Sequence, residues 1–170
     1  MKIVNGSAPD PALEWSPFKN TVNWTIPSGD GQKVIYSLFK DSAGNEFGPL
    51  SAAITLDTVA PTGNTISVLE SDSSTSAIAT FSLIDDLPKY LHFNVTDTST
   101  YKVHYYVGPA TTTPPTEYLE LFSPFSPVEL GTNNLILGDN KMWAYFSDEA
   151  GNDGFLQNTT LRVEGPEIEM

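Results

Sequence analysis

One phrase of the sequence occurs twice, and this repetition restricts the folds that the chain can adopt. YSLFKDSAGNEFG occupies residues 36–48, and AYFSDEAGNDGF occupies residues 144–155. Matching positions, such as Phe39 and Phe146, lie 107 residues apart. In both copies a strand-like run leads into Asp, Gly and Asn, which favour a tight turn because Asp accepts amide hydrogen bonds and Gly adopts a left-handed backbone. The phrase predicts one hairpin connection used twice.

The rest of the chain has the period of β-strands, with almost no helical periodicity. Thr, Ser, Val, Ile and aromatic residues alternate in short runs that Gly, Pro, Asn and Asp separate. The clearest runs are KVIYSLF (33–39), SAAITL (51–56), TISVL (65–69), AIATFSLI (77–84), YLHFNVT (90–96), YKVHYYV (101–107), NKMWAYF (140–146) and TTLRVE (159–164). Many short strands with one apolar face predict an all-β antiparallel sandwich or barrel.

Composition excludes several classes of function. The 170 residues include no Cys, only 2 His, and 21 acidic against 8 basic residues, for a net charge of −13. Nucleic acids and anionic membranes require clustered Lys and Arg, so neither is an expected partner. No run is long enough to span a membrane, and the N-terminal residues lack the apolar segment of a secretory signal.

The sequence divides at a short segment that contains Pro. We place this linker at residues 59–63, where Pro61 fixes its own dihedral and restrains Ala60 to extended geometry. Residues 64–164 hold enough strands for a sandwich of seven strands, which takes about 100 residues. Residues 1–58 provide about half of such a module. Residues 165–170 form an acidic tail.

The N-terminal third also carries a family resemblance. WSPF at 15–18, the run from Trp24 to Asn45 and SAAITLDTVAPT at 51–62 resemble the second half of a bacterial immunoglobulin-like repeat. Such repeats stand in tandem in large surface and adhesin-like proteins and also occur on phage virion proteins. The resemblance implies an immunoglobulin-like β-sandwich, with residues 1–58 as a partial module that lacks the first two strands. It implies display, spacing or adhesion, and neither catalysis nor a fixed ligand.

The sequence offers no catalytic constellation. Without Cys, a nucleophile would be Ser or Thr activated by His92 or His104, and both His lie in the middle of alternating strands. Two His and no Cys are also too few for a typical zinc site. We therefore expect no enzyme activity and no bound cofactor.

Acidic residues near turns raise the question of calcium, which takes six to eight oxygen ligands. The chief candidates are Asp148, Asn152 and Asp153, next to Glu149. Further candidates are Asp85 with Asp86, Asp57, and Asp41 with Asn45. None of these spacings matches a dedicated loop such as the EF-hand. Turn-forming Asp and Asn explain the same residues, and we prefer that interpretation.

Alternation in the repeated strand separates a core face from an outward face. We assign to the core the face that contains the two phenylalanines of the repeated phrase. This face carries Ile35, Ser37 and Phe39 in the first copy and Met142, Ala144 and Phe146 in the second. The opposite face carries Tyr36, Leu38, Trp143 and Tyr145. Tyr and Trp anchor many interfaces, so these four residues are the predicted partner surface. The alternative is that they pack under the Thr- and Pro-rich loop at 108–118.

These observations predict a non-enzymatic display protein. The favoured role is an accessory or decoration protein of a phage capsid or tail, located in the virion, which docks by its N-terminal part and projects a sandwich domain. A protein of the assembly or a second copy of the chain would be the partner. The alternatives are a fragment of a secreted bacterial adhesin and a glycan-binding surface module whose outward aromatic residues stack on host-surface sugars.

Overall fold

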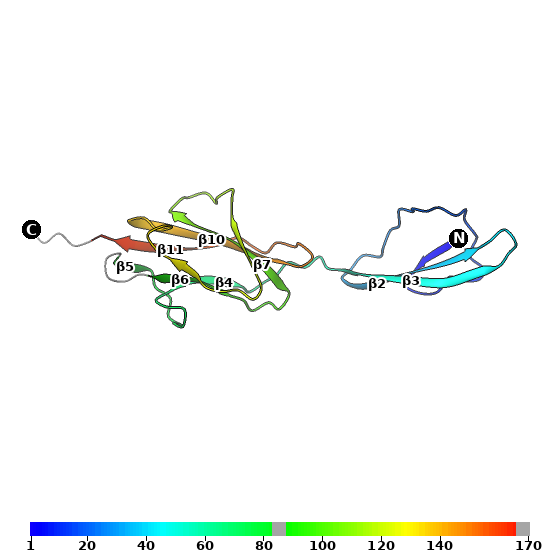
Figure 1. The fold of residues 1–170 in the computed structure, drawn as a ribbon, viewed down its shortest axis with the longest axis horizontal. Helices are drawn as coiled ribbons and strands as arrows, with labels where there is room; N and C mark the ends of the chain where they lie inside the picture. Colours follow the sequence, from blue (N-terminus) through cyan, green and yellow to red (C-terminus); the bar gives the residue numbers. More distant parts are fainter. Residues whose placement is uncertain (83–87, 166–170) are drawn as a thin grey trace, which may run out of the picture. The chain divides into compact units, whose positions relative to one another are not determined.

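The computed structural model describes residues 1–82 and 88–165 (Figure 1). These residues form strands, turns and bends without any helix, which confirms the predicted all-β class. The chain divides into two compact units, Met1–Val59 and Ala60–Met170. The division falls at the start of the segment 59–63 that the sequence marks as a linker. Residues 166–170 of the expected acidic tail lie outside the described residues.

The first unit contains a single three-stranded sheet in the order β1-β2-β3. Its strands are β1 (Lys2–Asn5), β2 (Gly31–Lys40) and β3 (Glu46–Leu56). Both pairings are antiparallel, with Ile3 opposite Ser37 and Ile35 opposite Ala52. Residues 6–30 connect β1 to β2 without regular secondary structure. The central strand β2 therefore has hydrogen-bonded neighbours on both sides, whereas β1 and β3 are the edge strands.

The second unit contains two sheets, one of five strands in the order β5-β11-β10-β7-β8 and one of three in the order β4-β6-β9. The strands are β4 (Thr65–Leu69), β5 (Thr80–Ser82), β6 (Lys89–Asn94), β7 (Thr100–Pro109), β8 (Leu119–Phe122), β9 (Val128–Leu130), β10 (Gly138–Asp148) and β11 (Gln157–Glu164). All pairings are antiparallel except one: β5 runs parallel to β11 and pairs with its last residues, Arg162–Glu164. In Figure 1, β10 and β11 of the larger sheet lie above β4 and β6 of the smaller sheet.

One apolar core joins these two layers. The larger sheet contributes Met142, Ala144 and Phe146, each no more than 2% exposed, and the smaller sheet contributes residues such as Leu91. Phe93 of β6 lies edge-on to Phe146 with ring centroids 6.4 Å apart. Two sheets whose inner faces share a core form a β-sandwich, in agreement with the expected architecture.

Several predicted strands differ in extent from the observed ones. The run 77–84 was expected as one strand, but within its described part only Thr80–Ser82 forms β5, while Ala77 makes an isolated bridge to Leu69. The sequence runs also omitted β8 and β9, which have four and three residues. Strands this short have too few residues for an alternation to be recognised, and their pairing with β7 and β6 defines them.

Candidate functional site

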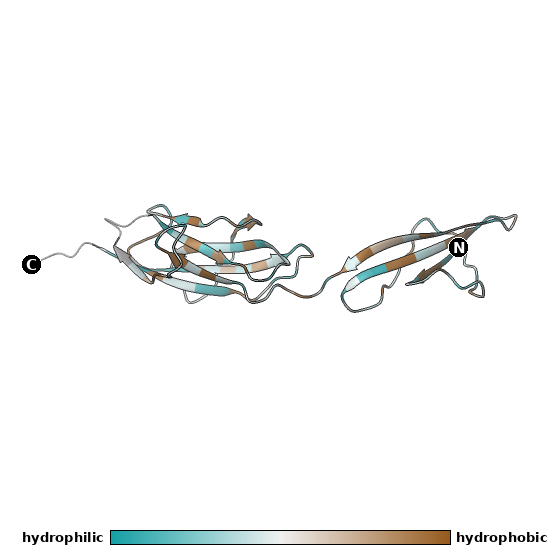
Figure 2. Ribbon diagram, turned by 90° about the horizontal axis from the view of Figure 1, so that it is seen from below, coloured by the Kyte–Doolittle hydropathy of each residue, from teal (hydrophilic) through white to brown (hydrophobic). Residues whose placement is uncertain are grey.

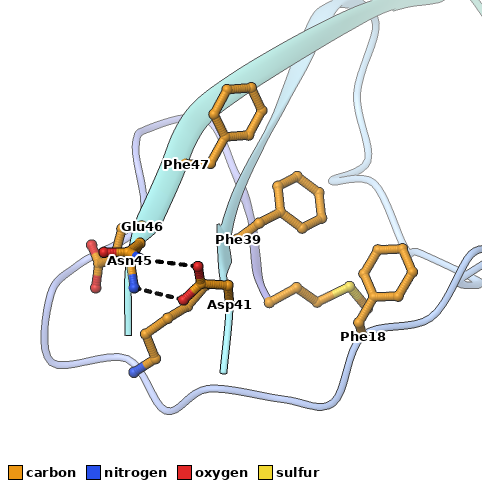
Figure 3. A pocket seen from close by; sticks show the side chains of 8 residues that line it. Phe18, Phe39, Asp41, Asn45, Glu46 and Phe47 are labelled. Carbon is orange, nitrogen blue, oxygen red and sulfur yellow. Dashed lines mark hydrogen bonds between the residues drawn. The ribbon is translucent and has the colours of Figure 1, made fainter. Parts of the chain in front are cut away.

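The repeated phrase folds into the same turn in both units. In the first unit, the Oδ1 atom of Asp41 accepts hydrogen bonds from the amides of Ala43 and Asn45, at 2.9 and 2.8 Å. Its Oδ2 atom accepts from the side-chain amide of Asn45 at 2.8 Å (Figure 3). Gly44 has φ of +94°, which other residues rarely adopt. These hydrogen bonds, that of the Asn45 side chain foremost, hold the pKa of Asp41 below its ordinary value.

The turn of the second unit repeats this geometry. The carboxylate of Asp148 accepts from the backbone and side-chain amides of Asn152, at 2.9 and 2.8 Å, and Gly151 has φ of +89°. Burial raises the pKa of the Asp148 carboxyl, but the hydrogen bonds from Asn152, Gly151 and Ala150 outweigh burial, and the pKa is lowered. Asp, Gly and Asn thus fulfil the turn role that their spacing predicts.

The calcium candidates are engaged in these turn contacts. Both oxygens of Asp148 accept hydrogen bonds from Asn152, and the carboxylate of Asp153 accepts one from the hydroxyl of Ser147 at 2.5 Å. Asp57 accepts from the amide of Val59 at 3.1 Å. Asp85 and Asp86 lie outside the described residues. Over residues 1–82 and 88–165, no group of three or more His, Asp or Glu is arranged to hold a metal ion.

A carboxylate and an aromatic ring lie next to His104. The Nδ1 atom of His104 lies 3.2 Å from Glu120, and its ring stacks on Tyr145 at 4.3 Å. Ser147 lines the same groove, of about 280 Å³, but its hydroxyl donates to Asp153. Burial, together with Lys102, lowers the pKa of His104 despite Glu120 and Asp153. Burial also lowers the pKa of His92 despite the nearby charge of Asp72.

The predicted partner surface is only partly outward-facing. Trp143 is 6% exposed, so the expectation that this side chain is exposed is wrong. The ammonium of Lys141 lies 4.5 Å from the Trp143 ring, and the neighbouring Tyr145 packs between His104 and Tyr118. Tyr118 ends the loop at 108–118, so Tyr145 contacts that loop as in the alternative interpretation. A partner role for Tyr36, Leu38, Trp143 and Tyr145 stays a prediction.

The surface that stands out is the face of the first unit assigned to the core. Cross-strand pairing places on this face the large side chains Ile3, Ile35, Phe39, Phe47, Leu50 and Ile54, which we call the apolar face. Phe47, Leu50 and Ile54 are 66%, 47% and 55% exposed. Phe39, expected to be buried, is only partly buried. Figure 2 shows hydrophobic segments along the strands of this unit.

The connection between β1 and β2 borders this face. Phe18 lies edge-on to Phe39 with centroids 6.1 Å apart, yet it is 66% exposed (Figure 3). Val22 and Trp24 continue the border, and the Trp24 indole donates to the side chain of Asn5 at 2.8 Å. Together these residues line a groove of about 440 Å³, and the adjoining groove at the turn adds Phe47. Residues of the β1–β2 connection therefore lie along the border of the apolar face, while Phe47, Leu50 and Ile54 remain exposed.

The opposite face of the same sheet carries the part of the β1–β2 connection around Trp15. Lys2 is 3% exposed, and its ammonium donates to the carbonyl of Pro11 at 2.8 Å. The ring of Trp15 lies 4.7 Å from the ammonium of Lys2 and 4.3 Å from that of Lys40, so it contacts two strands. Such cation–π contacts hold the segment around Trp15 on this side.

The second unit shows what the apolar face lacks. Its strands β7, β10 and β11 have the same order and direction as β1, β2 and β3, and Met142, Ala144 and Phe146 occupy the positions of Ile35, Ser37 and Phe39. There the sheet β4-β6-β9 covers the face. The first unit, all of whose residues are described, contains no second sheet.

The sequence assigned Ile35, Ser37 and Phe39 to the core, and it also indicated that the core of residues 1–58 lacks a covering layer. The available signal was the shortness of residues 1–58, which leaves no strands for a second layer. Phe47 and Leu50 were not singled out, because they lie outside the alternating run at 51–56.

Among the residues that the structure describes, no helix is long and apolar enough to cross a membrane. No family model, no curated protein and no solved structure matches this chain.

Proposed function

We propose that this chain is a non-enzymatic display protein: the first unit docks onto a protein assembly, and the second unit is the domain presented. A capsid or tail of a phage virion is the setting that we favour, on the strength of the resemblance to immunoglobulin-like repeats. On this proposal both units derive from that sandwich, the second complete and the first partial.

The contrast in burial between the units supports this proposal. In the described part of the chain, all buried hydrophobic residues lie between Val68 and Val163, within the second unit. The first unit instead exposes Phe18, Phe47 and Ile54 on one face. Contiguous exposed apolar surface on a monomer is uncommon and marks interaction sites. The second unit has a core of its own, and the first unit has a face that requires a partner.

The distribution of charge supports the same division of roles. Residues 1–59 carry four of the 8 basic and six of the 21 acidic residues. The remaining residues carry four basic and fifteen acidic side chains, and thus nearly all of the net charge of −13. Strong like charge keeps a surface soluble and unassociated, whereas a nearly neutral apolar surface associates readily.

The secreted-adhesin interpretation shares this architecture and differs in its setting. The glycan-binding interpretation needs open aromatic faces for sugar stacking. One face of Tyr145 is stacked on His104, and its ring also contacts Tyr118. Those contacts reduce the aromatic area left for a sugar ring, so we favour docking over glycan binding.

Immunogold electron microscopy of the source culture tests the proposal. An antibody raised against residues 64–164 should label the surface of assembled particles. An antibody against residues 1–58 should label them only after dissociation, because docking covers that unit. Label confined to the soluble fraction would contradict display, and label on cell surfaces would favour the adhesin.

A further inference from the structure

The apolar face lacks a layer whose size the second unit defines. In the second unit, a sheet of three strands, β4-β6-β9, covers the three equivalent strands β7, β10 and β11. It does so with aliphatic and aromatic side chains such as Val68, Leu91 and Phe93. Sheets of a sandwich pack about 10 Å apart with interdigitating side chains. The missing layer is therefore a three-stranded sheet with one apolar side.

We propose that a second copy of this chain supplies that layer, so that two first units pack face to face as one six-stranded sandwich. The sheet β1-β2-β3 itself has three strands, and its apolar face carries large aliphatic and aromatic side chains, so it matches the missing layer in size and chemistry. A two-fold axis brings the same patch together from both copies, and such isologous dimers are the commonest homo-oligomers. On this inference the apolar face is the seam between two copies, and the paired first units together are the part that docks onto the assembly, so the inference rests on the proposed function.

Lys33, the one charged side chain that strand pairing places on the apolar face, favours one orientation of the copies. Lys33 lies on the apolar-face side of β2 near its start, opposite Ile54, and Asp41 lies in the turn at its far end. Eight residues of strand separate them by about 26 Å. A two-fold axis perpendicular to the strands places Lys33 of one copy over the Asp41 end of the other. An axis parallel to the strands would place Lys33 of one copy beside Lys33 of the other, which is unfavourable.

Net charge favours this unit over the other as the dimer surface. The first unit has four Lys and six acidic residues, so two copies repel each other weakly. The second unit has eleven more acidic than basic residues, and close approach of two such surfaces is opposed at physiological salt. The interface therefore consists of the apolar face, bordered by Phe18 and Trp24.

Sedimentation of the full chain at increasing concentration tests the dimer. We expect a shift from 18.5 kDa to twice that mass as concentration rises. Ile54→Glu introduces a charge on the apolar face and should raise the dissociation constant about tenfold or more. Thr55→Glu is the matched control: Thr55 is the adjacent exposed residue of β3, points to the opposite face, and should leave the dimer intact.

A charge reversal tests the orientation. Lys33→Glu should weaken the dimer, and more so at low salt, because it opposes the Asp41 end of the other copy. A tighter dimer would overturn the perpendicular axis. Amide spectra of the first unit provide the folding control for every variant, since all of these substitutions lie in that unit.

The outcomes separate this inference from the proposed function. A wild-type chain that stays monomeric at about 300 μM would overturn the second-copy proposal. So would a dimer that Ile54→Glu leaves unchanged. If particles are still labelled by the antibody against residues 64–164, display stands and another protein of the assembly covers the apolar face. If the dimer forms as expected but no surface is labelled, the dimer stands and display fails.

Discussion

Phe39 and Phe146 occupy equivalent positions in the repeated phrase and end in different environments. Phe146 is 2% exposed and contacts Phe93 of the opposing sheet. Phe39 is partly exposed, and its described ring contact is with Phe18 of the β1–β2 connection. Residue type and strand position are thus the same, while the layer packed above the ring differs. Whether the phenylalanine is buried therefore depends on the segment that packs over it and not on the residue type.

Replacing each of the two phenylalanines by Ala should reduce the free energy of unfolding by different amounts. Phe146→Ala removes a fully buried ring and should reduce the free energy of unfolding of the second unit by about 3–5 kcal/mol. Phe39→Ala removes a ring that already contacts water and should cost a dilute monomer about 1–2 kcal/mol. Denaturant unfolding followed by the amide signals of each unit measures both values. Equal costs would show that the apolar face is covered within one chain.

At the scale of elements, the hairpin turn is the unit that the chain uses twice. In both copies the Asp amide donates to the Asn carbonyl, at 3.0 Å from Asp41 to Asn45 and 3.2 Å from Asp148 to Asn152. The Gly between them has a positive φ in both. The hydrogen bonds of each turn are made within the turn itself, so its formation needs no tertiary contact.

Gly151→Ala should therefore destabilise through backbone strain alone. Its φ of +89° is unfavourable for any residue with a Cβ, whereas the added methyl group would meet no atom within 4 Å. The left-handed conformation costs about 1–2 kcal/mol for such a residue. Gly131→Ala is the control, because that position has equal space and no positive φ, and it should change stability by less than about 0.5 kcal/mol. Thermal unfolding compares the two variants; similar effects would rule out strain as the cause.

At the scale of the whole molecule, two units with different numbers of sheets share one chain. The second has two sheets around one core, and the first has one sheet with an edge strand, β3, in which all residues but Leu56 are exposed. Regions with few buried apolar contacts open at lower free energy than packed cores. The two units should therefore unfold separately.

Hydrogen exchange of the full chain measures this difference. Amides of β10, such as those of Met142 and Phe146, should exchange only when the second unit unfolds. Amides of β2 in dilute protein should exchange at least about a hundredfold faster. Protection of β2 should rise with protein concentration, because the dimer stabilises the first unit by mass action. Equal protection in both units at high dilution would contradict the view that the first unit is incomplete.

Features that depend only on neighbouring residues could be predicted from the sequence. The period of two predicted strands from Lys33 to Phe39 and from Asn140 to Phe146, and both lie within observed strands, β2 and β10. Asp, Gly and Asn at fixed spacing predicted the turns, because those contacts are local. Alternation also placed Met142, Ala144 and Phe146 together on the buried face of β10. These inferences needed no knowledge of distant residues.

Only the tertiary structure decided which faces are covered. Trp143 was assigned outward and is 6% exposed, whereas Phe39 was assigned inward and remains partly exposed. The short strands β8 and β9 likewise depend on their pairing with β7 and β6. Alternation defines two faces of a strand but not what packs on either. That outcome depends on segments far away in the chain, or on a second chain, and for this reason exposed residues such as Phe47 and Leu50 were identified only in the folded unit.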